Sequence, residues 1–337
     1  MCVKIEILFK SEKVKFKSFS LFCNMFLNAL KNNNFLSYFY YLLLAAGFNV
    51  AVFQSEILVN DFAFVDLHHF FGADWLYRSL FLLFWLTSAL WINRLMAKYK
   101  ILDLKGGLPT FLYMLMSFAF WHTFLSLDII LAILFLLFML EQLMIIYHNQ
   151  CRLYQSMNIG LLFGCASFFY FPLLLIFPWA IFALSVCKTL KWRDYVFPIF
   201  GAIIPFYVYS CFQFFNDLPN KLFTQMTISF EIPKALGELF QHSYLFVFTA
   251  VILLLVVFSS YVKKRTQTLK NRVFYDVLLL LFVGIIVLSF FGANSFAELS
   301  FFLFPLSFLG AMYFDAYKRK WFFDVLVIGY FVLYLVS

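Results

Sequence analysis

An apolar stretch of 31 residues, 157–187, reads MNIGLLFGCASFFYFPLLLIFPWAIFALSVC, and Pro172 and Pro178 interrupt it. Proline ends or kinks a helix because it has no backbone N–H and its ring clashes with the preceding turn. The stretch therefore predicts either one kinked membrane-spanning helix or two short helices, 157–170 and 172–187. This choice decides on which side of the membrane every later loop lies.

Clusters of Lys and Arg favour two short helices. Cytoplasmic loops of multi-pass membrane proteins hold an excess of these residues, and two helices keep all three later clusters on the cytoplasmic side, whereas one helix would place them outside. Each short helix falls below the usual span of roughly 20 residues, so we expect local thinning of the bilayer or burial inside the bundle. The clusters are Lys188, Lys191 and Arg193; Lys263, Lys264, Arg265, Lys270 and Arg272; and Lys318, Arg319 and Lys320.

The composition indicates that lipid is the solvent of this chain. Of its 337 residues, 64% are apolar and 12% are charged, which is more apolar surface than one soluble core can hide. A net charge of +8 would suggest nucleic acid in a soluble protein. Here the cations lie at the ends of apolar runs, where they meet anionic head groups, so we expect no nucleic-acid partner.

The predicted fold is all-α, a polytopic transmembrane bundle of about eleven helices with a cytoplasmic N-terminus and a periplasmic C-terminus. A basic segment, 1–34, comes before a single transmembrane domain, 35–337, and Met25 is an alternative start. External loops are expected at 54–75 and 216–243. Besides the two short helices, the expected spans are 35–53, 76–92, 109–127, 129–147, 195–215, 244–262, 273–291, 296–314 and 321–336.

The first external loop carries the candidate site. It contains Glu56, Asp61 and Asp66 followed by His68 and His69, with no Lys or Arg. These carboxylates could take a proton from an acceptor, or hold a metal ion against a lipid pyrophosphate. The histidines with the two aspartates could bind a divalent ion. More commonly, such residues simply belong to a solvated external loop. Its lack of Lys and Arg then reflects only the gathering of basic residues on the cytoplasmic side.

Ionisable residues at membrane depth are few. Glu141, Asp276 and Asp324 lie within about two turns of predicted cytoplasmic helix ends. They could form a proton or ion relay, because charge in a membrane is usually tied to a pathway or a partner. We favour boundary anchoring, with Arg152, Arg272 or Lys320 as partners. The six cysteines predict no disulfide framework.

Two segments carry a resemblance to known proteins. Residues 152–172, RLYQSMNIGLLFGCASFFYFP, and 191–206, KWRDYVFPIFGAIIPF, resemble an uncharacterised family of multi-pass inner-membrane proteins from Bacteroidota. This resemblance implies a bacterial inner-membrane location and assigns no activity.

A more distant resemblance concerns Gly160-x3-Gly164-x-Ala166 and the proline turn after it. This pattern is similar to paired short helices in GT-C glycosyltransferases, which use polyprenyl-phosphate sugars. The resemblance implies that an acid of the first external loop, Asp61 or Asp66, activates the acceptor or helps bind metal.

In that reading Glu56, His68 and His69 would help bind substrate, and Arg78 is the external cation placed to meet the lipid phosphate. The loop is shorter than in that class. Two alternatives stay open: a non-catalytic membrane subunit or scaffold of an envelope assembly, which implies envelope protein partners, and a carrier.

Overall fold

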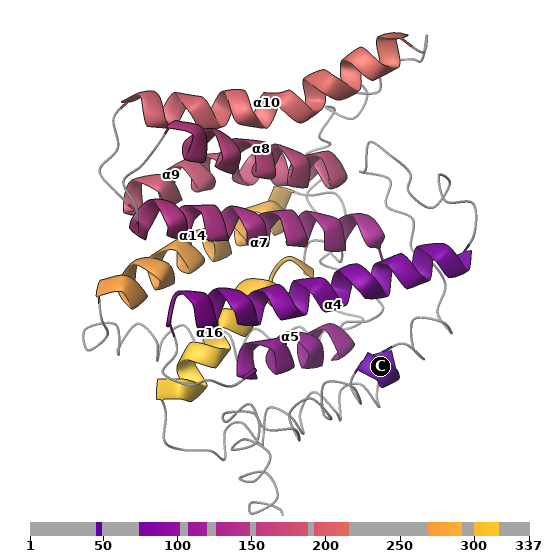
Figure 1. Cartoon of the computed structure of the whole chain (residues 1–337), viewed down its shortest axis with the longest axis vertical. Coiled ribbons are helices and arrows are strands. Elements are labelled where there is room, and N and C mark those ends of the chain that lie inside the picture. The colour runs from indigo at the N-terminus through magenta and orange to yellow at the C-terminus, as the bar shows by residue number, and fades with distance from the viewer. Residues whose placement is uncertain are drawn as a thin grey trace, which may run out of the picture.

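The computed structural model describes residues 45–48, 74–101, 107–119, 126–148, 153–187, 192–215, 269–291 and 300–316. Within these ranges the chain is helical and contains no β-strand, which confirms the all-α prediction for this part (Figure 1). The elements are α4 (Asp74–Lys98), α5 (Leu108–Ala119), α7 (Leu127–His148), α8 (Leu153–Phe169), the 3-10 helix η1 (Phe171–Ile176), α9 (Phe177–Cys187), α10 (Trp192–Phe215), α14 (Leu269–Phe291) and α16 (Leu303–Ala316).

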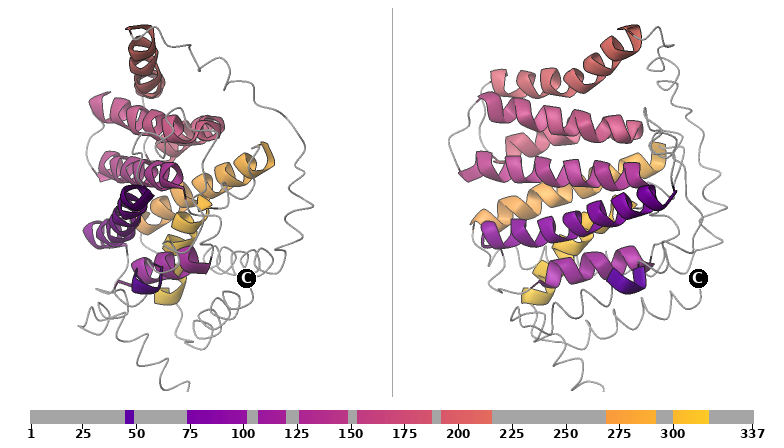
Figure 2. Two further views of the ribbon diagram at one scale, coloured as in Figure 1. Left: turned by 90° about the vertical axis from the view of Figure 1, so that its right-hand side faces the viewer. Right: turned by 45° about the vertical axis from the view of Figure 1, so that its right-hand side comes forward.

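The helices form two layers with their long axes roughly side by side (Figures 1 and 2). In the first layer α10 packs on α8, α8 on α7, α7 on α4 and α4 on α5. In the second layer α9 packs on α14 and α14 on α16, which returns to α5. Helix α10 therefore lies at one edge of the stack, and α8 is its main neighbour.

The directions of α4, α5 and α7 follow from the contacts between them. The backbone N–H of Leu127 donates to the Tyr77 hydroxyl at 2.9 Å near the start of α4 and α7, and Lys98 bonds Glu141 near their ends. These two helices therefore run parallel. Helix α5 runs the opposite way, because Thr110 near its start bonds the carbonyl of Ala89 in the second half of α4. This alternation of helix directions is the one that the predicted spans require.

The stretch 157–187 divides, as predicted, after residue 170, into α8 and a second helical segment, η1 with α9, that run in opposite directions. Helices α8 and α10 run parallel at a constant offset. Gly160 lies against Pro198, Gly164 lies against Ala202, and the Phe168 and Phe206 rings are 6.3 Å apart. The segment between α8 and α10, which is η1 followed by α9, must therefore return to the end at which α8 began. Pro172 begins this return within the first turn of η1, where its missing N–H is not needed.

Glycine lets the backbones of α8 and α10 touch. A Cβ added to Gly160 would lie 1.9 Å from the carbonyl oxygen of Pro198, and one added to Gly164 would lie 2.5 Å from that of Ala202. From the other side, a Cβ on Gly201 would lie 2.3 Å from the carbonyl oxygen of Met157. We call these contacts the glycine seam. Small residues at such spacing let helices approach closely in membranes, where association depends on packing.

Except for Arg78 at the start of α4, the basic residues of the described ranges lie at one end of the bundle, which we call the basic end. Helix α4 ends there, α10 begins there, and α14 begins there because it runs antiparallel to α16, with Phe274 on Phe308 and Phe282 on Phe302. The opposite end holds the starts of α4, α7 and α16. The residues of the basic end are Arg94, Lys98, Lys100, Arg193 and Arg272. Their gathering is what the charge rule for cytoplasmic ends expects.

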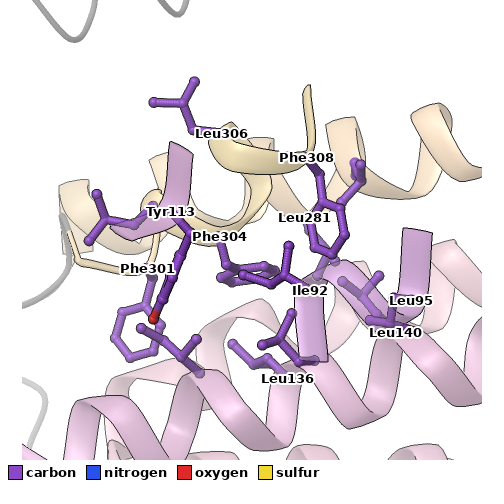
Figure 3. Close-up of a cluster of buried hydrophobic side chains, with 14 of the residues drawn as sticks. Ile92, Leu95, Tyr113, Leu136, Leu140, Leu281, Phe301, Phe304, Leu306 and Phe308 are labelled. Atoms are coloured by element: carbon purple, nitrogen blue, oxygen red, sulfur yellow. The ribbon is translucent and has the colours of Figure 1, made fainter. Parts of the chain in front are cut away.

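Three helices of the described part are long and apolar enough to cross a membrane: α4, residues Leu127–Tyr147 of α7, and α10. Shorter apolar helices are Leu108–Ser117, Phe171–Cys187 and Leu303–Phe314. The core joins both layers. Figure 3 shows Ile92 of α4, Tyr113 of α5, Leu136 of α7, Leu281 of α14 and Phe304 of α16 packed together. The first layer thus contributes to the same apolar interior as the second.

Some predicted bounds need correction. Helix α4 continues to Lys98, beyond the predicted end at 92, because long basic side chains can reach the interface from the last turns of a span. Helix α16 begins at Leu303 after a turn at 301–302 that interrupts the predicted span 296–314, whose first residues, 296–299, lie outside the described residues. Pro305 then lies in its first turn, where no N–H is needed. Outside the described residues lie 1–34, most of 35–53, nearly all of the first external loop, and the loop and spans predicted at 216–262 and 321–336.

Candidate functional site

The predicted site residues fall mainly on a part of the chain that lies outside the described residues. Glu56, Asp61, Asp66, His68 and His69 belong to it. The loop that carries them leads directly into α4, so its attachment point is the end of the bundle where α4 and α7 begin. The described residues nearest to the predicted site therefore lie at that end.

Arg78 is the predicted site residue that the structure describes. It is half-buried on the second turn of α4, next to the buried Tyr77. The Tyr77 hydroxyl accepts the hydrogen bond from the N–H of Leu127, which is one of the N–H groups that a helix start leaves without an intrahelical acceptor. This bond holds the starts of two parallel helices side by side. The positive ends of both helix dipoles therefore face the same surface, on which the Arg78 guanidinium adds a full positive charge.

Two buried polar residues begin α7 at the same end. Ser126 is 2% exposed and Asp128 is 4% exposed. A carboxylate in the first turn of a helix is stabilised by the helix dipole. Position 128 falls between the predicted spans 109–127 and 129–147, and the hydropathy pattern does not predict its burial. The available signal was an acid between two long apolar runs with no basic neighbour in sequence.

The acid at membrane depth, Glu141, is held by a cation from another helix. Its side chain is 12% exposed, and its carboxylate accepts from the Lys98 ammonium of α4 at 2.5 Å. The Tyr99 hydroxyl also donates to the Glu141 backbone carbonyl, at 3.4 Å. Burial raises the pKa of Tyr99, so the hydroxyl stays protonated as a donor. Boundary anchoring thus describes Glu141, with Lys98 as its partner, while Arg152 and Lys320 lie outside the described residues.

Neutralising Lys98 should destabilise the protein by about 1–2 kcal/mol. Removing one partner of a buried pair costs about 3–5 kcal/mol, and exposed pairs contribute less than about 1 kcal/mol. Lys98 is 44% exposed, which places this pair between the two cases. Thermal unfolding of Lys98→Met in neutral detergent measures the loss. Glu141→Gln should cost less, because a neutral amide needs no counter-ion.

Lys100→Met is the matched control for Lys98, because it removes an exposed neighbouring cation that has no ion pair in the described part of the chain. It should leave the unfolding temperature unchanged within about 1 °C. Equal losses for Lys98→Met and Lys100→Met would show that the ion pair contributes nothing.

The remaining acids considered at membrane depth are Asp276 and Asp324. Asp276 is half-buried on α14, four residues after Arg272, and Asp324 lies outside the described residues. Cys165, Cys187 and Cys211 are free thiols. Among the residues that the structure describes, no three His, Cys, Asp or Glu side chains lie close enough together to hold a metal ion. The metal site considered for His68 and His69 falls outside these ranges.

No family model, curated protein or solved structure matches the chain. Function must therefore be argued from the arrangement of its own residues.

Proposed function

We propose that the chain is a bacterial inner-membrane protein of about eleven helices, with its N-terminus in the cytoplasm and its C-terminus outside. Three described helices are long and apolar enough to span a membrane. The alternating helix directions and the gathering of cations at one end support this arrangement, because the basic end of such a protein faces the cytoplasm. The ends of α4 and α7 that hold Arg78 and Asp128 then face the outside.

For the activity, we propose a lipid-linked sugar transferase of the GT-C type that works at the outer face in envelope glycan assembly. The observation that carries this proposal is the side-by-side start of α4 and α7, fixed by the bond between Leu127 and Tyr77. The first turns of these helices carry the acids Asp74 and Asp128, so the Arg78 guanidinium is the group that would meet the phosphate of a polyprenyl-phosphate sugar between the helices.

In this proposal the acids of the first external loop supply the general base. Asp66 is eight residues before the start of α4, so chain length alone keeps it within about 28 Å of Asp74. Asp61 or Asp66 would act as the base that takes the proton of the acceptor hydroxyl. Glu56, His68 and His69 would help to bind the substrate.

A second candidate, a non-catalytic membrane subunit, is favoured by the outer face of α10. Phe200 is 60% exposed, Tyr207 67% and Phe212 59%, on a helix that packs mainly on α8. This apolar face suits a partner helix as well as it suits lipid. The carrier hypothesis has less support, because Glu141 is engaged in an ion pair at the basic end instead of lying free at membrane depth.

The test is purification from native membranes in mild detergent, followed by mass spectrometry of bound lipids and proteins. The transferase predicts a stoichiometric polyprenyl-phosphate lipid. It also predicts that Asp61→Asn or Asp66→Asn lowers glycan transfer in those membranes by about 100-fold or more, since a general base contributes about 10²–10⁴-fold.

Asp74→Asn is the matched acidic control. Asp74 is exposed on the first turn of α4 and should be dispensable for transfer. Normal transfer by both loop variants, together with a stable set of envelope proteins and no such lipid, would reject the transferase and identify a membrane subunit.

A further inference from the structure

Helix α4 ends in a conformation that its sequence does not favour. Lys100 has a φ of 47°. Among the described residues other than glycine, it is the one with a positive φ. The N–H of Ile101 bonds the carbonyl of Met96 at 3.1 Å, and the N–H of Lys100 bonds that of Ala97 at 3.2 Å. This pair of bonds is the Schellman motif, in which glycine usually takes the left-handed position. Lysine costs about 1 kcal/mol more there, because its Cβ crowds the backbone.

The strained lysine is the last of three exposed cations on the final turns of α4 and the turn that follows it. Arg94, Lys98 and Lys100 are all exposed, whereas Leu95 and Tyr99 between them are buried. Arg94 and Lys98 lie beside α7, and Lys100 follows the last residue of α4. We call them the α4 cation cluster.

Neighbouring side chains hold two of these cations in place. The Arg94 guanidinium lies 4.7 Å from the centre of the Trp91 ring, and that ring packs edge-on against Phe138 of α7 at 4.7 Å. Lys98 is held by Glu141, as described above. Because Glu141 cancels one charge, Arg94 and Lys100 carry the net positive charge of the cluster. The position of Arg94 is fixed by an aromatic ring that belongs to the packed interior.

The cluster lies where a membrane surface would meet the protein. Helix α4 is apolar enough to span a membrane, and its basic end is shared with the starts of α10 and α14. An aromatic ring next to a basic residue at the end of a span is typical of the membrane–water interface. Basic groups at the cytoplasmic surface attract anionic phospholipids, each contributing about 1 kcal/mol.

We propose that the α4 cation cluster binds the phosphate of an anionic phospholipid in the leaflet at the basic end. Arg94 supplies two parallel N–H donors that match a phosphodiester, and Lys100 supplies a point charge just past the end of the same helix. The charge of Lys100 then offsets the cost of its left-handed conformation. This site is at the end of the bundle opposite the proposed transferase site, so either can be absent without the other.

The experiment compares lipid binding by the full chain and by the double variant Arg94→Gln/Lys100→Gly, using native mass spectrometry in neutral detergent. The probes are phosphatidylglycerol and phosphatidylcholine. The wild-type chain should bind phosphatidylglycerol more tightly, and the double variant should lose about 30-fold in that affinity at low salt, or about fivefold for each cation removed. Binding of phosphatidylcholine should not change.

Two controls separate binding from folding and from general charge. Lys100→Gly alone should bind phosphatidylglycerol about fivefold more weakly, yet unfold at a higher temperature, because glycine relieves the left-handed conformation. Arg193→Gln removes a different cation of the basic end, which lies 5.6 Å from the Trp192 ring at the start of α10. It should leave the tightest phosphatidylglycerol site intact. An equal loss for Arg193→Gln, or a double variant that binds within twofold of wild type, would overturn the proposal.

Discussion

Replacing Gly160 with alanine should destabilise the protein by more than about 3 kcal/mol and prevent α10 from packing in its native position. The new Cβ would lie 1.9 Å from the carbonyl oxygen of Pro198, which is a backbone atom and cannot rotate away. Overpacking typically costs about 1–3 kcal/mol, and more where no side chain can move. The effect should be large because α10 packs mainly on α8.

Gly310→Ala is the matched control for Gly160. Gly310 also lies inside an apolar helix, α16, but its Cβ would meet the tip of the Leu112 side chain at 3.3 Å. A flexible side chain can give by that amount, and alanine favours a helix by about 1 kcal/mol over glycine, so the net effect should be close to zero. Size-exclusion chromatography after heating in detergent measures both variants. Equal stability of the two would show that the glycine seam is not required.

Trp85→Ala should cost about 3–5 kcal/mol, which is the usual range for a buried aromatic side chain. Trp85 is fully buried in the middle of α4. Its ring stacks on Phe48 with centroids 4.2 Å apart, and its Nε1 donates to the Ser117 hydroxyl of α5 at 2.9 Å. The change therefore removes a large packed volume and a bond between two helices. Thermal unfolding of the purified chain measures the loss.

Ser117→Ala separates these two contributions. It keeps the ring and removes only the acceptor, so it should cost about 0.6 kcal/mol, and at most about 1.7 kcal/mol, as for other hydrogen bonds between membrane helices. Trp75→Ala is the exposed counterpart on the same helix, with 67% of its side chain exposed, and it should leave stability unchanged. A loss for Trp75→Ala as large as that for Trp85→Ala would contradict the assigned core.

The division of the stretch 157–187 could be predicted because two independent signals agreed. Pro172 and Pro178 marked a break, and the later basic clusters required an extra crossing. Helix positions were also predictable where apolar runs are bounded by charge. The predicted 129–147 differs from α7, Leu127–His148, by two residues at one end and one at the other. The predicted helix end was wrong where a span carries basic residues inside its last turns, as in α4, which continues to Lys98.

Contacts between helices could not be predicted, because they depend on which faces meet. Glu141 was expected to pair near its own helix end, yet its partner is Lys98, which lies on the parallel helix α4. Gly160 and Gly164 were recognisable in sequence, but nothing identified Gly201 as the opposing glycine. The burial of Asp128 likewise follows from the neighbouring start of α4. A hydropathy pattern records how apolar each helix is and carries no record of its neighbours.

The parallel course of α8 and α10 also sets an order of events during synthesis. Gly160 and Gly164 leave the ribosome well before Pro198 and Ala202, and the intervening chain must first cross back through η1 and α9. Until α10 has been inserted, the glycine face of α8 therefore has lipid tails against it in place of a partner. In a nascent chain stopped after α9, the glycine face of α8 would have no helix packed against it. Such a chain should be a target for membrane quality-control proteases.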